Sequence, residues 1–273
     1  MEKKKSCIVY FLLVFIMCLS VFLFSATAHR WSAENVGLDH AFTGSELTRL
    51  FGRHISNYET GIINALRRLV LYGSFGFVGL HLWSRAGFKG IVNDDIKRRK
   101  SIFITVLAGL SMGIYFIIYD VILTNIFRLP MLMYPYSRIP ASIFSSLAEG
   151  IGCPILNMFT VAFIMWLFSG AVKTEEGRDR LFCMAAILCA LVFSARHIES
   201  TMLWYAGSLN IFRMPSREYM AIIGLYAPLS LVCTYFMKKY GLLSAVGIHF
   251  ISDIMWRIGW AYIQYGELIL TWR

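Results

Sequence analysis

Long uninterrupted apolar segments constrain this chain more than any other feature of its sequence. They recur along the chain with few charged residues inside them. A helix needs about 20 apolar residues to cross the hydrocarbon core of a bilayer, and only helices or closed barrels satisfy their backbone hydrogen bonds there. Because the apolar residues run continuously and do not alternate with polar ones, the sequence predicts an all-α, polytopic transmembrane helix bundle.

Short polar segments and Gly- or Pro-containing segments separate the predicted helices. The seven predicted ranges are roughly 7–26, 62–84, 101–125, 143–169, 181–205, 218–237 and 241–264. The segment 43–68 is typical either of an amphipathic interfacial helix or of an ordered outer loop. We divide the chain into N-terminal transmembrane helices with an outer loop (1–100), a helix-bundle core (101–265) and a short C-terminal tail (266–273).

The composition agrees with this fold class and argues against a nucleic-acid partner. Hydrophobic residues make up 58% and charged residues 15% of the chain, whereas soluble domains carry about 25% charged residues. The net charge of +10 comes mainly from basic residues at one set of helix ends, as expected for orientation signals in a lipid bilayer. These residues are Lys3, Lys4, Lys5, Arg85, Lys89, Lys97, Arg98, Arg99, Lys100, Lys173, Arg178, Arg180, Lys238 and Lys239.

This charge pattern predicts an integral, multi-pass membrane protein with a cytoplasmic N-terminus and an outer C-terminus. The opposite loops hold fewer basic residues, apart from Arg49, Arg53, Arg67 and Arg68 near the second helix. The N-terminal segment is similar to a signal peptide. Its apolar run of roughly 18 residues is longer than a usual signal core, so we expect a retained first helix.

The cysteines indicate neither a disulfide framework nor a zinc knuckle, because none of them forms a CxxC pair. All lie in apolar segments, and we expect buried, inert thiols. The six are Cys7, Cys18, Cys153, Cys183, Cys189 and Cys233.

Ionisable residues inside the predicted helices are candidates for function, because each costs several kcal/mol unless it faces the bundle interior and finds a partner. They are His81, Asp120, Glu149, His197, Glu199, His249, Asp253 and Arg257. His249 and Asp253 are four residues apart and therefore share a helix face. Such a pair can hold one metal ion or one water molecule.

Two of these segments carry a family resemblance. "FSARH" (193–197) and "HFISD" (249–253) match, in order, the FxxxH and HxxxN/D motifs of the CAAX protease and bacteriocin-processing (CPBP/Abi) family. The chain resembles this family over roughly residues 100–265. The resemblance implies an intramembrane peptidase of the bacterial plasma membrane that acts on peptide or protein substrates. It also implies that a glutamate and two histidines activate water, with or without a divalent metal such as zinc.

The family's first motif, EExxxR, has two possible positions in this chain. "EEGRDR" (175–180) fits the letters, but Glu175 precedes His197 by 22 residues, about 33 Å along one helix. If the glutamates instead lie in a loop, they lie in water, again far from His197. We therefore expect a solvated loop of mixed charge there.

Glu149, in "AEGIGCP", is the better candidate because it falls at a depth similar to that of His197 and Asp253. Its segment has a single glutamate and lacks the motif's arginine. Carried over from the family, the predicted catalytic residues are Glu149, His197, His249 and Asp253. The predicted metal ligands are Glu149, His197 and His249, and Asp120 and Phe193 are predicted to support them.

Three alternatives stay open at this point. In the first, Glu149 is not catalytic but a structural carboxylate paired with Asn157, His197 or Arg196. In the second, the chain is not a peptidase but a non-catalytic protein on the same scaffold that acts in bacteriocin immunity or envelope resistance. The third alternative is a transporter in which the buried charges lie along an ion path. Discontinuous helices are typical of transporters, and Pro154 is the one hint of such a helix.

Overall fold

A computed structural model describes residues 2–26, 44–88, 90–93, 96–126, 139–205, 216–260 and 262. Every regular element within these ranges is helical, which confirms the all-α prediction. The elements are α1 (Glu2–Ala26), α2 (Gly44–Phe51), α3 (Asn57–Arg85), α4 (Arg98–Asn125), α5 (Ile139–Leu167), η3 (Ser169–Ala171), α6 (Glu175–Tyr205), α7 (Ser216–Tyr240), α8 (Leu242–Ile254) and the π-helical turn η5 (Met255–Trp260).

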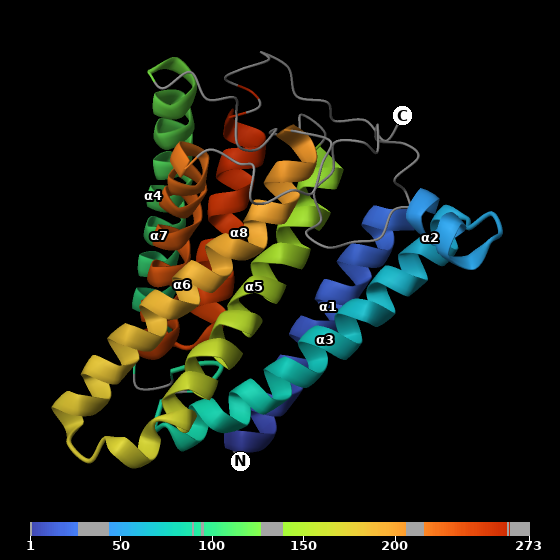
Figure 1. Cartoon of the computed structure of the whole chain (residues 1–273). Helices are drawn as coiled ribbons and strands as arrows, with labels where there is room; N and C mark the ends of the chain where they lie inside the picture. Colours follow the sequence, from blue (N-terminus) through green and yellow to red (C-terminus); the bar gives the residue numbers. More distant parts are fainter. Residues whose placement is uncertain are drawn as a thin grey trace.

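Six of the described helices are long and apolar enough to cross a membrane, so the chain is an integral multi-pass membrane protein. They are α1, α4, α5, α6, α7 and α8 with its continuation η5. The remaining predicted helix, 62–84, corresponds to α3. This helix has 29 residues and runs antiparallel to α1 along the bundle (Figure 1). Its composition is less apolar because it contains Glu59, Arg67 and Arg68.

The helices form two groups that meet at α5. In the first group, α1 and α3 pack against each other and against α5. In the second, α4 packs against α8, and α6 packs against α7. Because α5 also contacts α6 and α8, it joins the two groups (Figure 1). The candidate site residues on α5, α6 and α8 therefore lie in the middle of the bundle.

Glycines allow α5 to approach its neighbours closely, as is common between membrane helices. A Cβ atom on Gly79 of α3 would come within 2.9 Å of the Phe159 Cα, and one on Gly150 of α5 within 3.0 Å of the Phe250 Cα. These contacts fix the relative depth of the helices. Gly150 follows Glu149 and Phe250 follows His249, so both candidate residues lie at the same level of the bundle.

We call the two ends of the bundle the basic end, where α1, α4, α6 and α8 begin, and the far end, where these helices finish. At the basic end, the connection after α3 is hydrogen-bonded to the turn between α7 and α8. The Asn93 Nδ2 donates to the Lys239 carbonyl at 2.7 Å, and the Leu243 N–H donates to the Ile91 carbonyl at 3.0 Å. Gly241 makes this turn with a positive φ of 96°, a conformation that favours glycine.

The "EEGRDR" segment was predicted to be a loop, and this prediction is wrong. Residues 175–180 form the first turns of α6, while their side chains lie mostly at the surface as expected. The helix begins here because the Thr174 hydroxyl accepts from the Gly177 N–H at 3.1 Å, as an N-cap does. Glu175 and Glu176 favour the positive end of the helix dipole. They remain about 33 Å from His197 along α6.

Candidate functional site

The structure buries every residue that the sequence predicts for the site. Glu149 lies on α5, His197 and Phe193 on α6, His249 and Asp253 on α8, and Asp120 on α4. They do not form one constellation, however. Glu149 belongs to one cluster of contacts, and Phe193, His197, His249 and Asp253 belong to another.

The first cluster, which we call the histidine cluster, consists of Phe193, His197, Tyr226, His249 and Asp253. The His197 ring stacks on Tyr226 of α7, with ring centroids 3.8 Å apart and an interplanar angle of 22°. The Phe193 ring contacts both imidazoles, with centroid distances of 4.5 Å to His197 and 6.0 Å to His249. The two histidines of separate motifs thus meet around one buried phenyl ring.

Hydrogen bonding defines the neutral tautomer of His197. Its Nδ1 lies 2.8 Å from the Phe193 carbonyl oxygen, and a carbonyl can only accept. The Nδ1 therefore carries the hydrogen, and the Nε2 of the neutral ring carries the lone pair. This explains the spacing of FxxxH in this chain, because the carbonyl four residues earlier on a helix lies within reach of the imidazole.

Asp253 lies next to His249, as the four-residue spacing predicts. The distance from His249 Nε2 to Asp253 Oδ2 is 3.8 Å, and both side chains are buried. This separation is too long for a hydrogen bond but short enough for the carboxylate to stabilise a protonated imidazole. His249 and Asp253 therefore form a close pair of titratable groups inside the bundle.

The second cluster, which we call the charged cluster, consists of Arg68, Tyr72, Glu149, Cys153 and Arg196. Arg68 Nη2 is 2.7 Å from Glu149 Oε1, and both side chains are 5% exposed. Arg68 Nη1 donates to the Tyr72 hydroxyl at 2.7 Å, and Arg196 Nη2 donates to the same oxygen at 3.4 Å. The Cys153 thiol donates to Glu149 Oε2 at 3.4 Å.

Glu149 is therefore paired with an arginine of α3, not with any of the partners considered from the sequence. Asn157 instead donates to the Ser230 hydroxyl of α7 at 3.1 Å. An ion pair this well buried is costly to break, since either partner alone would be an uncompensated charge. The arginine that pairs with Glu149 comes from another helix and not from the segment around Glu149.

Sequence reasoning missed Arg68 because it was grouped with the basic residues near an outer loop. The signal that identifies it is a four-residue repeat of small and polar residues on α3. Asn64, Arg68, Tyr72 and Gly76 are all buried, while Leu66, Leu69 and Val70 between them are exposed. The polar face of α3 thus points into the bundle and its apolar face points outward.

The two clusters adjoin each other across α6. Arg196 and His197 are consecutive, yet Arg196 reaches Tyr72 of α3 while His197 stacks on Tyr226 of α7. The Gly150–Phe250 approach holds Glu149 and His249 at the same depth on α5 and α8.

The predicted zinc ligands do not fit a metal ion in this arrangement. Across the part of the chain that the structure describes, no three His, Cys, Asp or Glu residues are grouped so that they could hold one. Glu149 has one carboxylate oxygen on Arg68 and the other on the Cys153 thiol. The metal stays a prediction from the family resemblance.

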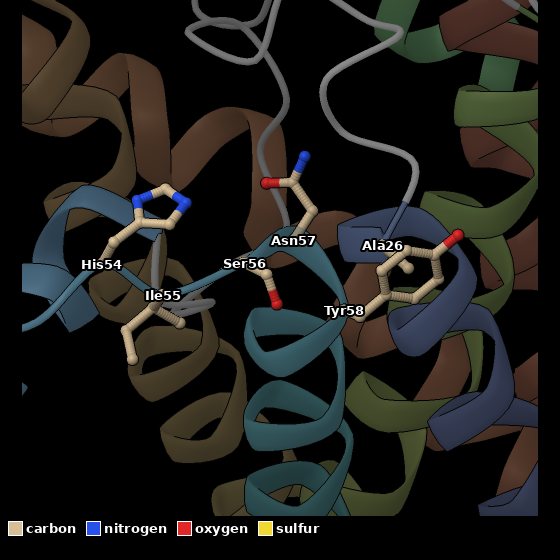
Figure 2. Close-up of a pocket in the computed structure, with 6 residues that line it drawn as sticks. All are labelled: Ala26, His54, Ile55, Ser56, Asn57 and Tyr58. Carbon is tan, nitrogen blue, oxygen red and sulfur yellow. The ribbon is translucent and has the colours of Figure 1, made fainter.

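A pocket of about 390 Å³ lies apart from both clusters, where α1 ends and α3 begins. Figure 2 shows its lining residues, which are Ala26, His54, Ile55, Ser56, Asn57 and Tyr58. Ser56 belongs to the capping box of α3, because its hydroxyl accepts from the Glu59 N–H and the Glu59 side chain accepts from the Ser56 N–H. The Ser56 hydroxyl and N–H at this pocket therefore serve to begin α3.

No family model, curated protein or solved structure matches this chain.

Proposed function

We propose that this protein is a membrane-embedded peptidase in which the histidine cluster activates water. The observation that supports this most directly is the meeting of His197 and His249 around Phe193, with Asp253 beside His249. Two buried imidazoles and a carboxylate at this distance are suited to general acid–base chemistry. The motif resemblance supports peptide-bond hydrolysis as the reaction.

In the proposed reaction, neutral His249 takes a proton from a water molecule as its oxygen attacks the peptide carbonyl carbon. Asp253 stabilises the resulting imidazolium. The tetrahedral intermediate then expels the amine, which takes the proton from His249, so the C–N bond breaks and a carboxyl and an amine remain. We assign Glu149 a positioning role, because its carboxylate holds Arg68 and through it Tyr72.

We further propose that the basic end faces the cytoplasm of a bacterial cell and that the far end faces outward. The excess of Lys and Arg at the basic end supports this orientation through the positive-inside rule. The N-terminus would then be cytoplasmic and the C-terminus outside. Both clusters would lie in the outer half of the plasma membrane, where substrates would enter from lipid or from the outer surface.

Quantitative comparison of membrane-derived peptides tests the proposal. Cells expressing wild-type protein should release peptides that are absent with His249→Ala or His197→Ala. His81→Ala provides the matched control, because His81 is an exposed histidine of α3. Unfolding temperatures of the purified variants separate a loss of chemistry from a loss of fold. Identical peptide sets from wild type and both folded histidine variants would favour the non-catalytic alternative.

A second candidate mechanism rests on the contact between the Cys153 thiol and Glu149. A thiol that is hydrogen-bonded to a carboxylate base can act as a nucleophile. Glu149 would take the thiol proton, the sulfur would form a thioester, and the leaving amine would take that proton. Water or another amine would then resolve the thioester. In the same assay, Cys153→Ala would remove the peptides under this mechanism and would leave them under the histidine mechanism.

A further inference from the structure

Arg257 and Trp256 form a second polar position on the α8–η5 helix, beyond the histidine cluster. Arg257 is 4% and Trp256 is 1% exposed. Both lie in the π-helical turn Met255–Trp260, and such turns occur frequently at functional sites. The Trp256 ring contacts Phe116 of α4 edge-on, with a centroid distance of 6.4 Å. The two side chains are therefore held inside the bundle near its far end.

Both side chains bring only donors to this position. The indole Nε1–H and the guanidinium N–H groups can donate hydrogen bonds but cannot accept them. Within the described ranges, neither Trp256 Nε1 nor Arg257 Nε has a hydrogen-bond partner. The ion pairs formed by the described residues do not include Arg257 either.

The chemistry of the missing partner follows from these two groups. An arginine does not lose its proton in a protein, so burial leaves a positive charge that requires compensation. A water molecule would satisfy a donor but would not neutralise the charge. An acceptor that carries negative charge would satisfy the donors and neutralise the charge together. Arg68 provides the internal comparison, since its guanidinium is matched by the Glu149 carboxylate at 2.7 Å.

The depth of the position indicates which anion is available. Arg257 follows Leu242, the first residue of α8, by 15 residues, about 22 Å along the helix. The hydrocarbon core is about 30 Å thick, so Arg257 lies in the third of the membrane next to the far interface. Phospholipid phosphates are the anions concentrated at that interface, and guanidinium groups bind phosphate with two parallel hydrogen bonds.

We infer that Arg257 and Trp256 form a binding site for a phosphate group at the far end of the bundle, supplied by an anionic phospholipid or by free phosphate. This inference does not depend on the proposed peptidase reaction. The phosphate oxygens would accept from Trp256 Nε1 and from the Arg257 guanidinium. Its binding would stabilise η5 and so the end of the helix that carries His249 and Asp253.

The test measures the unfolding temperature of the purified full-length protein in neutral detergent. One arm adds dioctanoyl phosphatidylglycerol, with dioctanoyl phosphatidylcholine at equal concentration as the zwitterionic control. The other adds sodium phosphate, with sodium chloride at equal ionic strength. We expect a saturable rise of about 5 °C in wild type, which Arg257→Gln abolishes and Trp256→Phe reduces. Arg53→Gln, which changes an exposed arginine at the far end, should retain the full rise.

The two arms identify the source of the phosphate. A rise with phosphatidylglycerol alone assigns a lipid headgroup, and an equal, Arg257-dependent rise with sodium phosphate assigns the free ion. Arg257→Lys keeps the charge without the forked donors, so it should respond only at higher probe concentration. This variant also provides the test if Arg257→Gln does not fold. The inference is overturned if no phosphate probe stabilises wild type, or if Arg257→Gln responds as wild type does.

Discussion

Arg68 and Arg257 are both buried arginines of the helix bundle, but their surroundings differ. Arg68 on α3 contacts the Glu149 carboxylate and the Tyr72 hydroxyl, so its charge is compensated from within the chain. Arg257 on η5 has no ion pair within the described part of the chain. Burying a charge costs free energy in either case. The difference suggests that the first arginine joins helices together, whereas the second serves a group from outside the protein.

The largest expected effect comes from breaking the compensated pair. Glu149→Ala leaves Arg68 buried without its carboxylate and should lower the free energy of unfolding by about 3–5 kcal/mol. Arg68→Met should have a similar effect, because it leaves Glu149 charged. The double variant Arg68→Met with Glu149→Leu should recover most of the loss. Reversible unfolding in mixed micelles measures all three, and additive losses in the double variant would contradict the pairing.

Removing one hydroxyl from the charged cluster should have a smaller effect. Tyr72→Phe keeps the ring but deprives Arg68 and Arg196 of a shared acceptor. We expect a loss of about 1–3 kcal/mol, the usual cost of an unsatisfied buried donor. Tyr58→Phe is the control, because it removes the same hydroxyl from a tyrosine that is 67% exposed. Equal losses in the two variants would show that Tyr72 has no special role.

The comparison of the two arginines predicts opposite signs for the same substitution. Arg257→Met removes a buried charge without leaving a charged partner behind. In phosphate-free detergent solution it should raise the free energy of unfolding by about 1 kcal/mol, since apolar replacement of buried charge is often stabilising. Arg68→Met lowers it under identical conditions. Equal destabilisation by both substitutions would contradict the view that the charge of Arg68 is compensated within the chain and that of Arg257 is not.

The smallest effect is expected at the surface of the basic end. Arg180 and Glu176 form an ion pair at 2.6 Å, with both side chains 77% exposed. Arg180→Ala should change the free energy of unfolding by less than about 0.5 kcal/mol, and added salt should reduce the change further. The same unfolding measurement provides the value. A loss comparable with that of Glu149→Ala would assign the "EEGRDR" segment a structural role that its exposure does not suggest.

Most of the fold could be predicted from the sequence because membrane helices are recognisable by their length and apolar composition. The seven predicted ranges correspond to α1, α3, α4, α5, α6, α7 and α8 with η5. Helix ends were less predictable. The range 181–205 omitted the first turns of α6, because charged residues near a boundary suggest a loop although Thr174 caps a helix there.

The candidate site was predictable in depth but not in pairing. Counting residues along helices predicted a similar depth for Glu149, His197 and Asp253, and the Gly150–Phe250 contact puts His249 at the level of Glu149. The partner of Glu149 could not be found in this way, because Arg68 is 81 residues away in the chain. Only the inward rotation of the polar face of α3 brings the two together. Whether the clusters catalyse hydrolysis stays a prediction.

The hydrogen bonds at the basic end have a mechanical consequence. Asn93 and Ile91 tie the start of α4 to the turn between α7 and α8, and Lys238 of α7 is 2.7 Å from Asp179 of α6. Helices fastened at one end can separate only by pivoting there, so the gap between them widens with distance from the pivot. A bulky molecule that reaches the two clusters would therefore separate the helices most readily at the far end of the bundle.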